Sequence, residues 1–94
     1  MITLLHTCPC CGYKTLEEPP GNFEICPICY WEDDTLQRED PFYTGGANEE
    51  SLYEAQQNFL KFGASCEKYI ASVRKPNFND SKDMSFRLIE KDNT

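Results

Sequence analysis

The sequence predicts a small α+β domain in which a β-hairpin carries two cysteine turns and one or two α-helices follow. Three observations predict this class. The 94 residues are enough for one domain, two Cys-x-x-Cys turns lie in the first third of the chain, and a helical pattern follows them. Because a chain of this length buries only a modest core, we expect a staple among its six cysteines.

The hairpin is expected near the start of the chain. Residues 13–16 and 23–25 are the expected strands, because Pro-Pro-Gly-Asn at residues 19–22 is a strong turn signal between them. We expect residues 1–76 to form a single domain and residues 77–94 to form a polar C-terminal tail.

The clearest helix is expected to begin near Asn48. Asn48 can cap its start, and Ser51 and Glu54 fit a capping box one turn later. Gly63 is the expected C-terminal stop. A second, shorter helix is expected over residues 65–73. The apolar face of the first helix recurs at helical spacing and contains Leu52, Ala55, Phe59 and Phe62.

Residues 30–48 are expected to form a loop, because they are acidic and contain Pro41 and the pair Gly45-Gly46. In the tail, apolar residues alternate with polar ones as in a strand. We expect a short strand over residues 84–90, which would pair with residues 2–5.

The two cysteine turns have the spacing of a metal site. The first turn reads Cys-Pro-Cys-Cys-Gly and the second Cys-Pro-Ile-Cys, and fourteen residues separate Cys11 from Cys26. Two residues between cysteines let both sulfurs chelate one ion, and a structural zinc site takes four such thiolates at about 2.3 Å. The sequence therefore predicts a zinc-ribbon-like fold with two cysteine knuckles and one Zn²⁺ per chain. The expected ligands are Cys8, Cys11, Cys26 and Cys29.

Three other donor residues are not expected to be ligands. Cys10 is adjacent to Cys11, and adjacent side chains diverge too far to share an ion. We expect Cys10 to be either an inert side chain or a reactive thiol with a pKa lowered by the nearby ion. Cys66 is expected to be a small buried hydrophobe, and His6 a bystander.

The first seven residues have no basic region, no sustained apolar run and no small-residue cleavage site, so no signal peptide is expected. The sequence contains no run of about 18 apolar residues, so no membrane span is expected. We therefore expect a cytoplasmic protein, in which reduced thiols bind metal instead of forming disulfides.

Several segments resemble one known family. They are Cys-Pro-Cys-Cys-Gly-Tyr, then Glu-Ile-Cys-Pro-Ile-Cys-Tyr-Trp-Glu-Asp-Asp, then Tyr-Thr-Gly-Gly-Ala-Asn and Phe-Gly-Ala-Ser. Over about residues 7–68 the chain is similar to the bacterial cysteine-rich CPCC family. The resemblance implies a bacterial source and a small zinc-ribbon-like domain followed by helix, and it implies no activity.

The sequence does not predict an enzyme. Four cysteines close the coordination shell of a zinc ion, whereas a hydrolytic site keeps one position open. With a single histidine in the chain, a nucleophile–base pair is not expected. The acidic run at residues 32–34 lacks the alternating spacing of a calcium loop and is expected to be solvated.

The charge is unevenly distributed. The chain has a net charge of −7, and residues 1–54 alone have eleven acidic and two basic residues, a net of −9. This half opposes a nucleic-acid backbone and favours a protein partner with a basic surface. Since small bacterial proteins sometimes accompany toxins as immunity partners, toxin neutralisation is one form of this hypothesis. The expected contact residues are Tyr30, Trp31, Asp33, Asp34 and Phe42.

Two alternative functions remain at this point. One is electron transfer with iron in place of zinc, as in rubredoxins, whose turns also read Cys-Pro-x-Cys-Gly. The second turn here ends in Tyr30 where rubredoxins have glycine, and the spacer is shorter than theirs. The other is a nucleic-acid-binding zinc ribbon, for which only the basic residues of the tail would be available.

Overall fold

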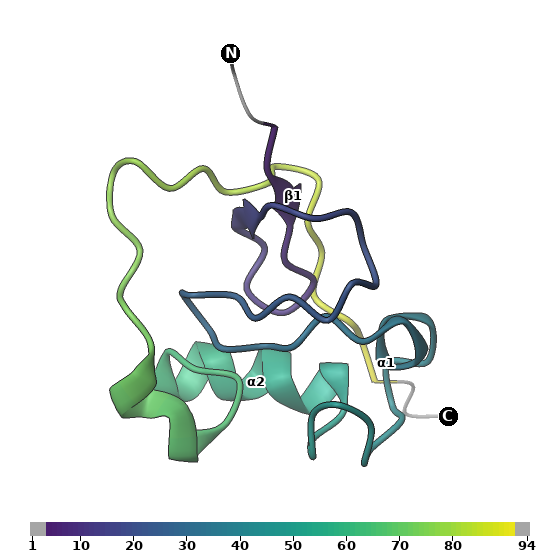
Figure 1. Cartoon of the computed structure of the whole chain (residues 1–94). Coiled ribbons are helices and arrows are strands. Elements are labelled where there is room, and N and C mark those ends of the chain that lie inside the picture. The colour runs from purple at the N-terminus through teal and green to yellow at the C-terminus, as the bar shows by residue number, and fades with distance from the viewer. Residues whose placement is uncertain (1–3, 92–94) are drawn as a thin grey trace.

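Two cysteine hairpins lie against one helix in the computed structural model, which describes residues 4–91 (Figure 1). Strands β1 and β2 form an antiparallel two-stranded sheet. The small α+β, zinc-ribbon-like fold class is confirmed. In chain order the elements are β1 (His6–Thr7), β2 (Lys14–Leu16), α1 (Thr35–Glu39), α2 (Leu52–Phe62) and the 3₁₀ helix η1 (Glu67–Ser72).

Each hairpin closes around its own cysteine turn. β1 and β2 flank the first turn, with His6 paired to Leu16. Around the second turn, the Asp33 backbone N–H donates to the Glu24 carbonyl at 3.0 Å, and Ile25 forms an isolated bridge with Glu32. The two strands expected from the sequence therefore do not pair with each other. A cysteine turn reverses the chain over a few residues, so each segment pairs with its nearer neighbour.

Helix α2 agrees with its sequence prediction. The Ser51 side chain accepts from the Glu54 backbone N–H at 3.1 Å, and the Glu54 carboxylate accepts from the Ser51 backbone N–H at 3.0 Å. This capping box fixes the start of the helix. At its end, the Gly63 N–H donates to the Phe59 carbonyl. Leu52, Ala55 and Gln56 are buried on the face that meets the hairpins.

The segment expected to be a loop, residues 30–48, contains the short helix α1. Asp34 caps it, because its Oδ1 accepts from the Leu36 backbone N–H at 2.8 Å. The sequence position of Asn48 suggested that it caps α2, but the N-cap of α2 is Ser51. Asn48 binds the backbone of Glu32 instead, with Nδ2 donating to the carbonyl at 2.8 Å and Oδ1 accepting from the N–H at 3.0 Å.

A buried glutamine organises the rest of this segment. Gln37 is fully buried, and its Nε2 donates to the carbonyls of Tyr43, Asn48 and Glu50 at 3.0–3.1 Å. Its Oε1 accepts from the Asn48 backbone N–H at 3.1 Å. The carbonyl groups of a polar stretch thus find partners inside the fold, where they would otherwise be unsatisfied.

The second helix is shorter than expected and has 3₁₀ geometry. η1 has no buried residue, and Ile70 is 47% exposed. Cys66, which precedes it, is partly exposed, so it is not the buried hydrophobe that the sequence suggested. A short 3₁₀ turn has poorer hydrogen bonds and a narrower apolar face than an α-helix, so it covers the core without entering it.

The C-terminal segment leaves η1, passes around the hairpins and returns toward α1 (yellow-green and yellow in Figure 1). The strand expected over residues 84–90 is not formed. Its backbone groups bind a turn and a side chain instead: the Phe86 N–H donates to the Asp83 carbonyl at 3.0 Å, and the Ile89 N–H donates to Gln56 Oε1 at 2.8 Å. Of the expected partner strand, Ile2 and Thr3 lie outside the described residues.

The core lies between the hairpins and α2. Its largest members are Trp31, Leu16 and Ile28, all fully buried, and Ile89 of the C-terminal segment packs against it. In residues 4–91, α2 is the longest helix at 11 residues, and no helix there is long and apolar enough to cross a membrane.

Candidate metal centre

The first cysteine turn is held by its own backbone. The Gly12 N–H donates to the Cys8 carbonyl at 2.9 Å, and the Cys8 N–H donates to the Tyr13 carbonyl at 2.9 Å. Gly12 has φ = +80°, a conformation that glycine adopts without steric cost. The turn directs the side chains of Cys8 and Cys11 to the same side.

The second turn repeats this geometry. The Tyr30 N–H donates to the Cys26 carbonyl at 2.8 Å, and the Cys26 N–H donates to the Trp31 carbonyl at 2.9 Å. Tyr30 has φ = +71°, which costs a residue with a side chain roughly 1–2 kcal/mol. Its ring stacks on Tyr69 of η1, with centroids 4.6 Å apart. This contact opposes the cost of the strained backbone.

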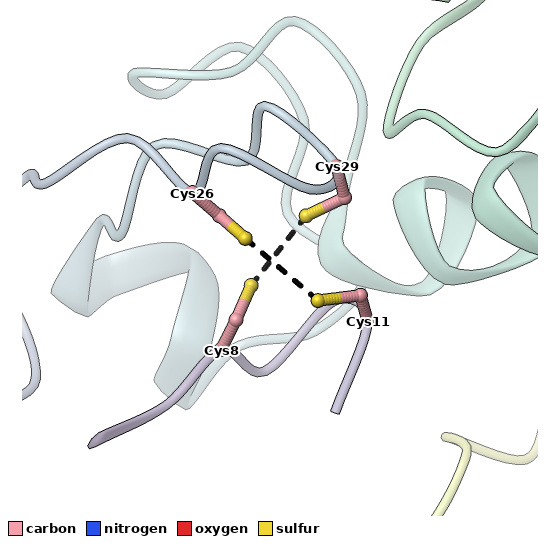
Figure 2. A group of neighbouring side chains, drawn as sticks. All are labelled: Cys8, Cys11, Cys26 and Cys29. Carbon is pink, nitrogen blue, oxygen red and sulfur yellow. Dashed lines mark hydrogen bonds between the residues drawn. The ribbon is translucent and has the colours of Figure 1, made fainter. Parts of the chain in front are cut away.

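Four sulfurs converge between the turns, as Figure 2 shows. All four lie within 4.8 Å of one another, with Cys8 Sγ 3.5 Å from Cys29 Sγ and Cys11 Sγ 3.8 Å from Cys26 Sγ. An ion bonded to four thiolates at about 2.3 Å in a tetrahedron places the sulfurs about 3.8 Å apart. The cluster therefore has the dimensions to bind one metal ion. Its members are Cys8, Cys11, Cys26 and Cys29.

The electrostatics of the cluster favour a cation at its centre. Burial raises the pKa of the Cys8 and Cys29 thiols well above the ordinary value. Hydrogen bonds from Cys11, Cys29 and Cys8 lower the pKa of Cys26. A bound cation would replace the shared thiol protons and stabilise all four sulfurs as thiolates.

Thr15 of β2 is a neighbour of the cluster that the sequence did not indicate. Its Oγ1 lies 3.0 Å from Cys26 Sγ, and both residues are buried. A hydroxyl that donates to a thiolate stabilises the negative charge and fixes the direction of the sulfur. No spacing pattern connects Thr15 with Cys26, so only the fold reveals this contact.

Later parts of the chain hold the two turns. Gln56 Nε2 of α2 donates to the Pro9 carbonyl at 2.8 Å, and Lys82 Nζ donates to the Cys11 carbonyl at 2.8 Å. On the second turn, the Ser65 N–H donates to the Cys29 carbonyl at 2.7 Å. These bonds satisfy carbonyls that the turns leave unpaired. All four cysteines of the cluster are fully buried.

The ring of Phe86 covers the first turn directly. A Cβ atom at Gly12 would lie 2.6 Å from Phe86 Cδ2, well inside van der Waals contact. Glycine is therefore needed at position 12 for two reasons: the positive φ and the close approach of the Phe86 ring.

The remaining donors are placed outside the four-sulfur group. Cys10 is 1% exposed, and burial raises the pKa of its thiol. His6 lies in β1 and Cys66 before η1. Among the described residues, the group of mutually close donors includes none of these three.

Three of the five residues expected to contact a partner are buried in the structure. Trp31 is fully buried, Asp33 is 1% exposed and Asp34 is 8% exposed. The Asp33 carboxylate accepts from Arg38 Nε at 3.2 Å and from the Gly21 N–H at 3.0 Å. These acids are not solvated, because they bind the backbone and an arginine inside the fold. Of the expected set, Phe42 is half exposed and Tyr30 is partly buried.

Comparison with known proteins agrees with this architecture. No curated protein matches the chain in sequence. The sequence model of the family described as "Cysteine-rich CPCC" matches residues 6–80, a span that contains both cysteine turns, the four-sulfur cluster and α2. The chain therefore belongs to the cysteine-rich CPCC family.

Proposed function

We propose that the chain is a structural zinc protein without catalytic activity. The observation that carries this proposal is the closed set of four buried sulfurs at tetrahedral separation. Zinc favours four thiolates in such a shell, and a shell filled by protein ligands leaves no position for substrate or water. Iron accepts the same ligands, so the metal is identified by analysis and colour: zinc thiolates are colourless and iron thiolates are red.

We further infer that the protein acts by binding another protein, and that it does so in the cytoplasm, where thiols stay reduced. The supporting feature is a surface around α1 in which exposed apolar side chains lie beside carboxylates. Leu36 and Phe42 are each 50% exposed and Tyr43 is 39% exposed. The residues of this acidic aromatic surface are Leu36, Glu39, Asp40, Phe42 and Tyr43.

The acidic aromatic surface is held rigidly. The Phe42 ring lies on Tyr53 of α2, with centroids 5.3 Å apart, and the Tyr53 N–H donates to the Pro41 carbonyl at 2.9 Å. The buried Gln37 side chain donates to the Tyr43 carbonyl through Nε2. Anchors that are already ordered lose little entropy on binding, which favours a contact surface.

The charge of this surface selects a basic partner. Glu39 and Asp40 are exposed, and among the described residues neither forms an ion pair. Such carboxylates speed encounter with a basic surface and add little when screened by salt. As the specific form of this partner we propose a toxin with a basic contact face, which this chain would neutralise as an immunity protein.

The test uses wild-type and charge-reversed protein as bait in a lysate of the native host. The double variant Glu39→Lys/Asp40→Lys should lose the retained partner, and so should Phe42→Ala. The matched control is Glu17→Lys/Glu18→Lys, which makes the same charge change at an exposed turn. If all variants retain the same proteins as wild type, the acidic aromatic surface is not the contact face.

A further inference from the structure

A groove of about 1020 Å³ runs between α2 and the C-terminal segment, both visible in Figure 1. One wall is an exposed stripe of α2 that includes Tyr53 and Leu60, which are seven residues apart and share a helix face. The opposite wall is residues 86–91. The hydrogen bond from the Ile89 backbone N–H to Gln56 Oε1 attaches this wall to α2.

The groove collects positive charge in an acidic protein. Lys82, Arg87 and Lys91 line it, and Glu90 is the one acidic residue among its lining, whereas the chain has a net charge of −7. Within residues 4–91, none of the three cations forms an ion pair with a carboxylate. Lys82 is fixed in place, because its Nζ donates to the Cys11 carbonyl at 2.8 Å.

The walls between these cations are apolar. Leu60 is 62% exposed and Leu88 is 43% exposed, and both border the groove with the rings of Tyr53 and Phe86. Cations that pair with no carboxylate of residues 4–91, beside aromatic and aliphatic walls, fit a ligand that carries carboxylates and apolar side chains together. A long nucleic acid fits less well, since the charge of the remaining surface repels its backbone.

We propose that this groove binds an acidic, apolar peptide segment of a protein partner. The groove has the opposite charge to the acidic aromatic surface and different charged residues, although Tyr53 of its wall packs on Phe42. The charge-reversed variants of the two sites therefore test the two proposals separately. The C-terminal wall of the groove lies beyond residues 6–80, the span matched by the family.

The experiment measures binding of a fluorescein-labelled eight-residue peptide that alternates glutamate with phenylalanine or leucine, by fluorescence anisotropy on the full metal-loaded protein. Wild type should bind it, and a peptide with lysine in place of glutamate should not bind. The double variant Arg87→Glu/Lys91→Glu should weaken binding at least about fivefold, because it reverses two exposed contacts. The matched control Lys61→Glu/Lys75→Glu changes the same charge at exposed positions outside the groove and should bind as wild type does.

A third variant, Leu60→Gln, removes the apolar wall without changing charge and should also weaken binding. Equal affinities of the groove and control double variants would overturn the proposal, as would equal binding of the lysine peptide. Tighter binding of an oligothymidine than of the acidic peptide would also overturn it. Dimerisation of wild type that the groove variant abolishes would show that the occupant is a second copy of this chain, and so would overturn the proposal of a separate partner.

Discussion

Gly12 and Tyr30 occupy the same place in the two cysteine turns. Each backbone N–H donates to the carbonyl of the first cysteine of its turn, at 2.9 Å to Cys8 and at 2.8 Å to Cys26, and φ is +80° at Gly12 and +71° at Tyr30. A glycine would fit both positions without strain. The second turn has a tyrosine whose ring binds Tyr69, so η1 is attached to the metal centre through a strained residue.

Replacing Tyr30 by glycine and by alanine separates the strain from the ring contact. Both changes remove the ring, but only Tyr30→Gly also relieves the left-handed backbone. We expect Tyr30→Gly to be more stable than Tyr30→Ala by about 1 kcal/mol in free energy of unfolding. Urea unfolding of the metal-loaded protein, followed by the fluorescence of the single tryptophan Trp31, measures it.

Tyr43 supplies the control for this prediction. It is a partly exposed tyrosine whose φ is not positive. Tyr43→Gly should therefore be less stable than Tyr43→Ala, by roughly 0.5–1 kcal/mol in free energy of unfolding. If alanine is the better residue at both positions, the left-handed conformation at Tyr30 is not a source of strain.

Asp33 is a structural carboxylate, and its neutralisation should destabilise the fold. Asp33→Asn weakens the ion pair with Arg38 and introduces an amide N–H₂ group into a buried site, so we expect a loss of about 1–3 kcal/mol in free energy of unfolding. Glu39→Gln removes the same charge from an exposed position and should change stability by less than about 0.5 kcal/mol. Equal melting temperatures of the two variants would contradict the buried role of Asp33.

Thr15 should position the sulfur of Cys26 for metal binding. Thr15→Val keeps the shape of the side chain and removes the hydroxyl that lies 3.0 Å from Cys26 Sγ. We expect the zinc affinity to fall about 10-fold or more, as for other groups that support metal ligands. Competition with a chromophoric chelator measures the affinity. Thr44→Val, at an exposed position, is the control and should bind zinc as wild type does.

Acid should release the metal before it affects the carboxylates of the C-terminal segment. Hydrogen bonds from Arg74 and Thr7 are the main causes that lower the pKa values of Asp80 and Asp83 to about 2, below the ordinary value of 3.8. Their contribution to stability is therefore fully present above about pH 4 and is lost only as the pH falls through about 2. Protons compete with the metal for the thiolates at higher pH.

The acid transition should consequently depend on the metal concentration. If two to four protons bind for each zinc ion released, a tenfold rise in free zinc should lower the midpoint of acid unfolding by about 0.25–0.5 pH unit. Fluorescence of Trp31 at two or three zinc concentrations measures the shift. A midpoint near pH 3 that does not respond to zinc would assign acid unfolding to the carboxylates instead.

The sequence predicted the four-cysteine cluster and α2 because both depend on local spacing. A Cys-x-x-Cys turn places two sulfurs together by itself, and the capping box of Ser51 and Glu54 is closed within one helical turn. The strand pairing was harder to predict from the sequence. Residues 14–16 could pair either with the segment before them or with the segment after them, and both lie at a similar distance along the chain.

The burial of Asp33 could not be predicted from the sequence, because burial of a carboxylate depends on distant groups. Asp33 looks like part of a solvated acidic run, yet Gly21 supplies a backbone N–H and Arg38 a guanidinium that satisfy it. The C-terminal segment presents the same difficulty. Lys82 binds the Cys11 carbonyl although the two residues are 71 positions apart in the sequence, and no periodic pattern predicts such a contact.

The most direct test of the proposed zinc centre is X-ray absorption at the metal edge, combined with elemental analysis, on protein purified from its native host. We expect one zinc ion per chain bonded to four sulfurs at about 2.3 Å. Cys8→Ser should lose the metal and much of the fold, whereas Cys10→Ser and Cys66→Ser should keep one zinc per chain. Iron in the site, fewer than four sulfur ligands, or loss of metal from Cys10→Ser but not from Cys8→Ser would contradict the proposed zinc centre.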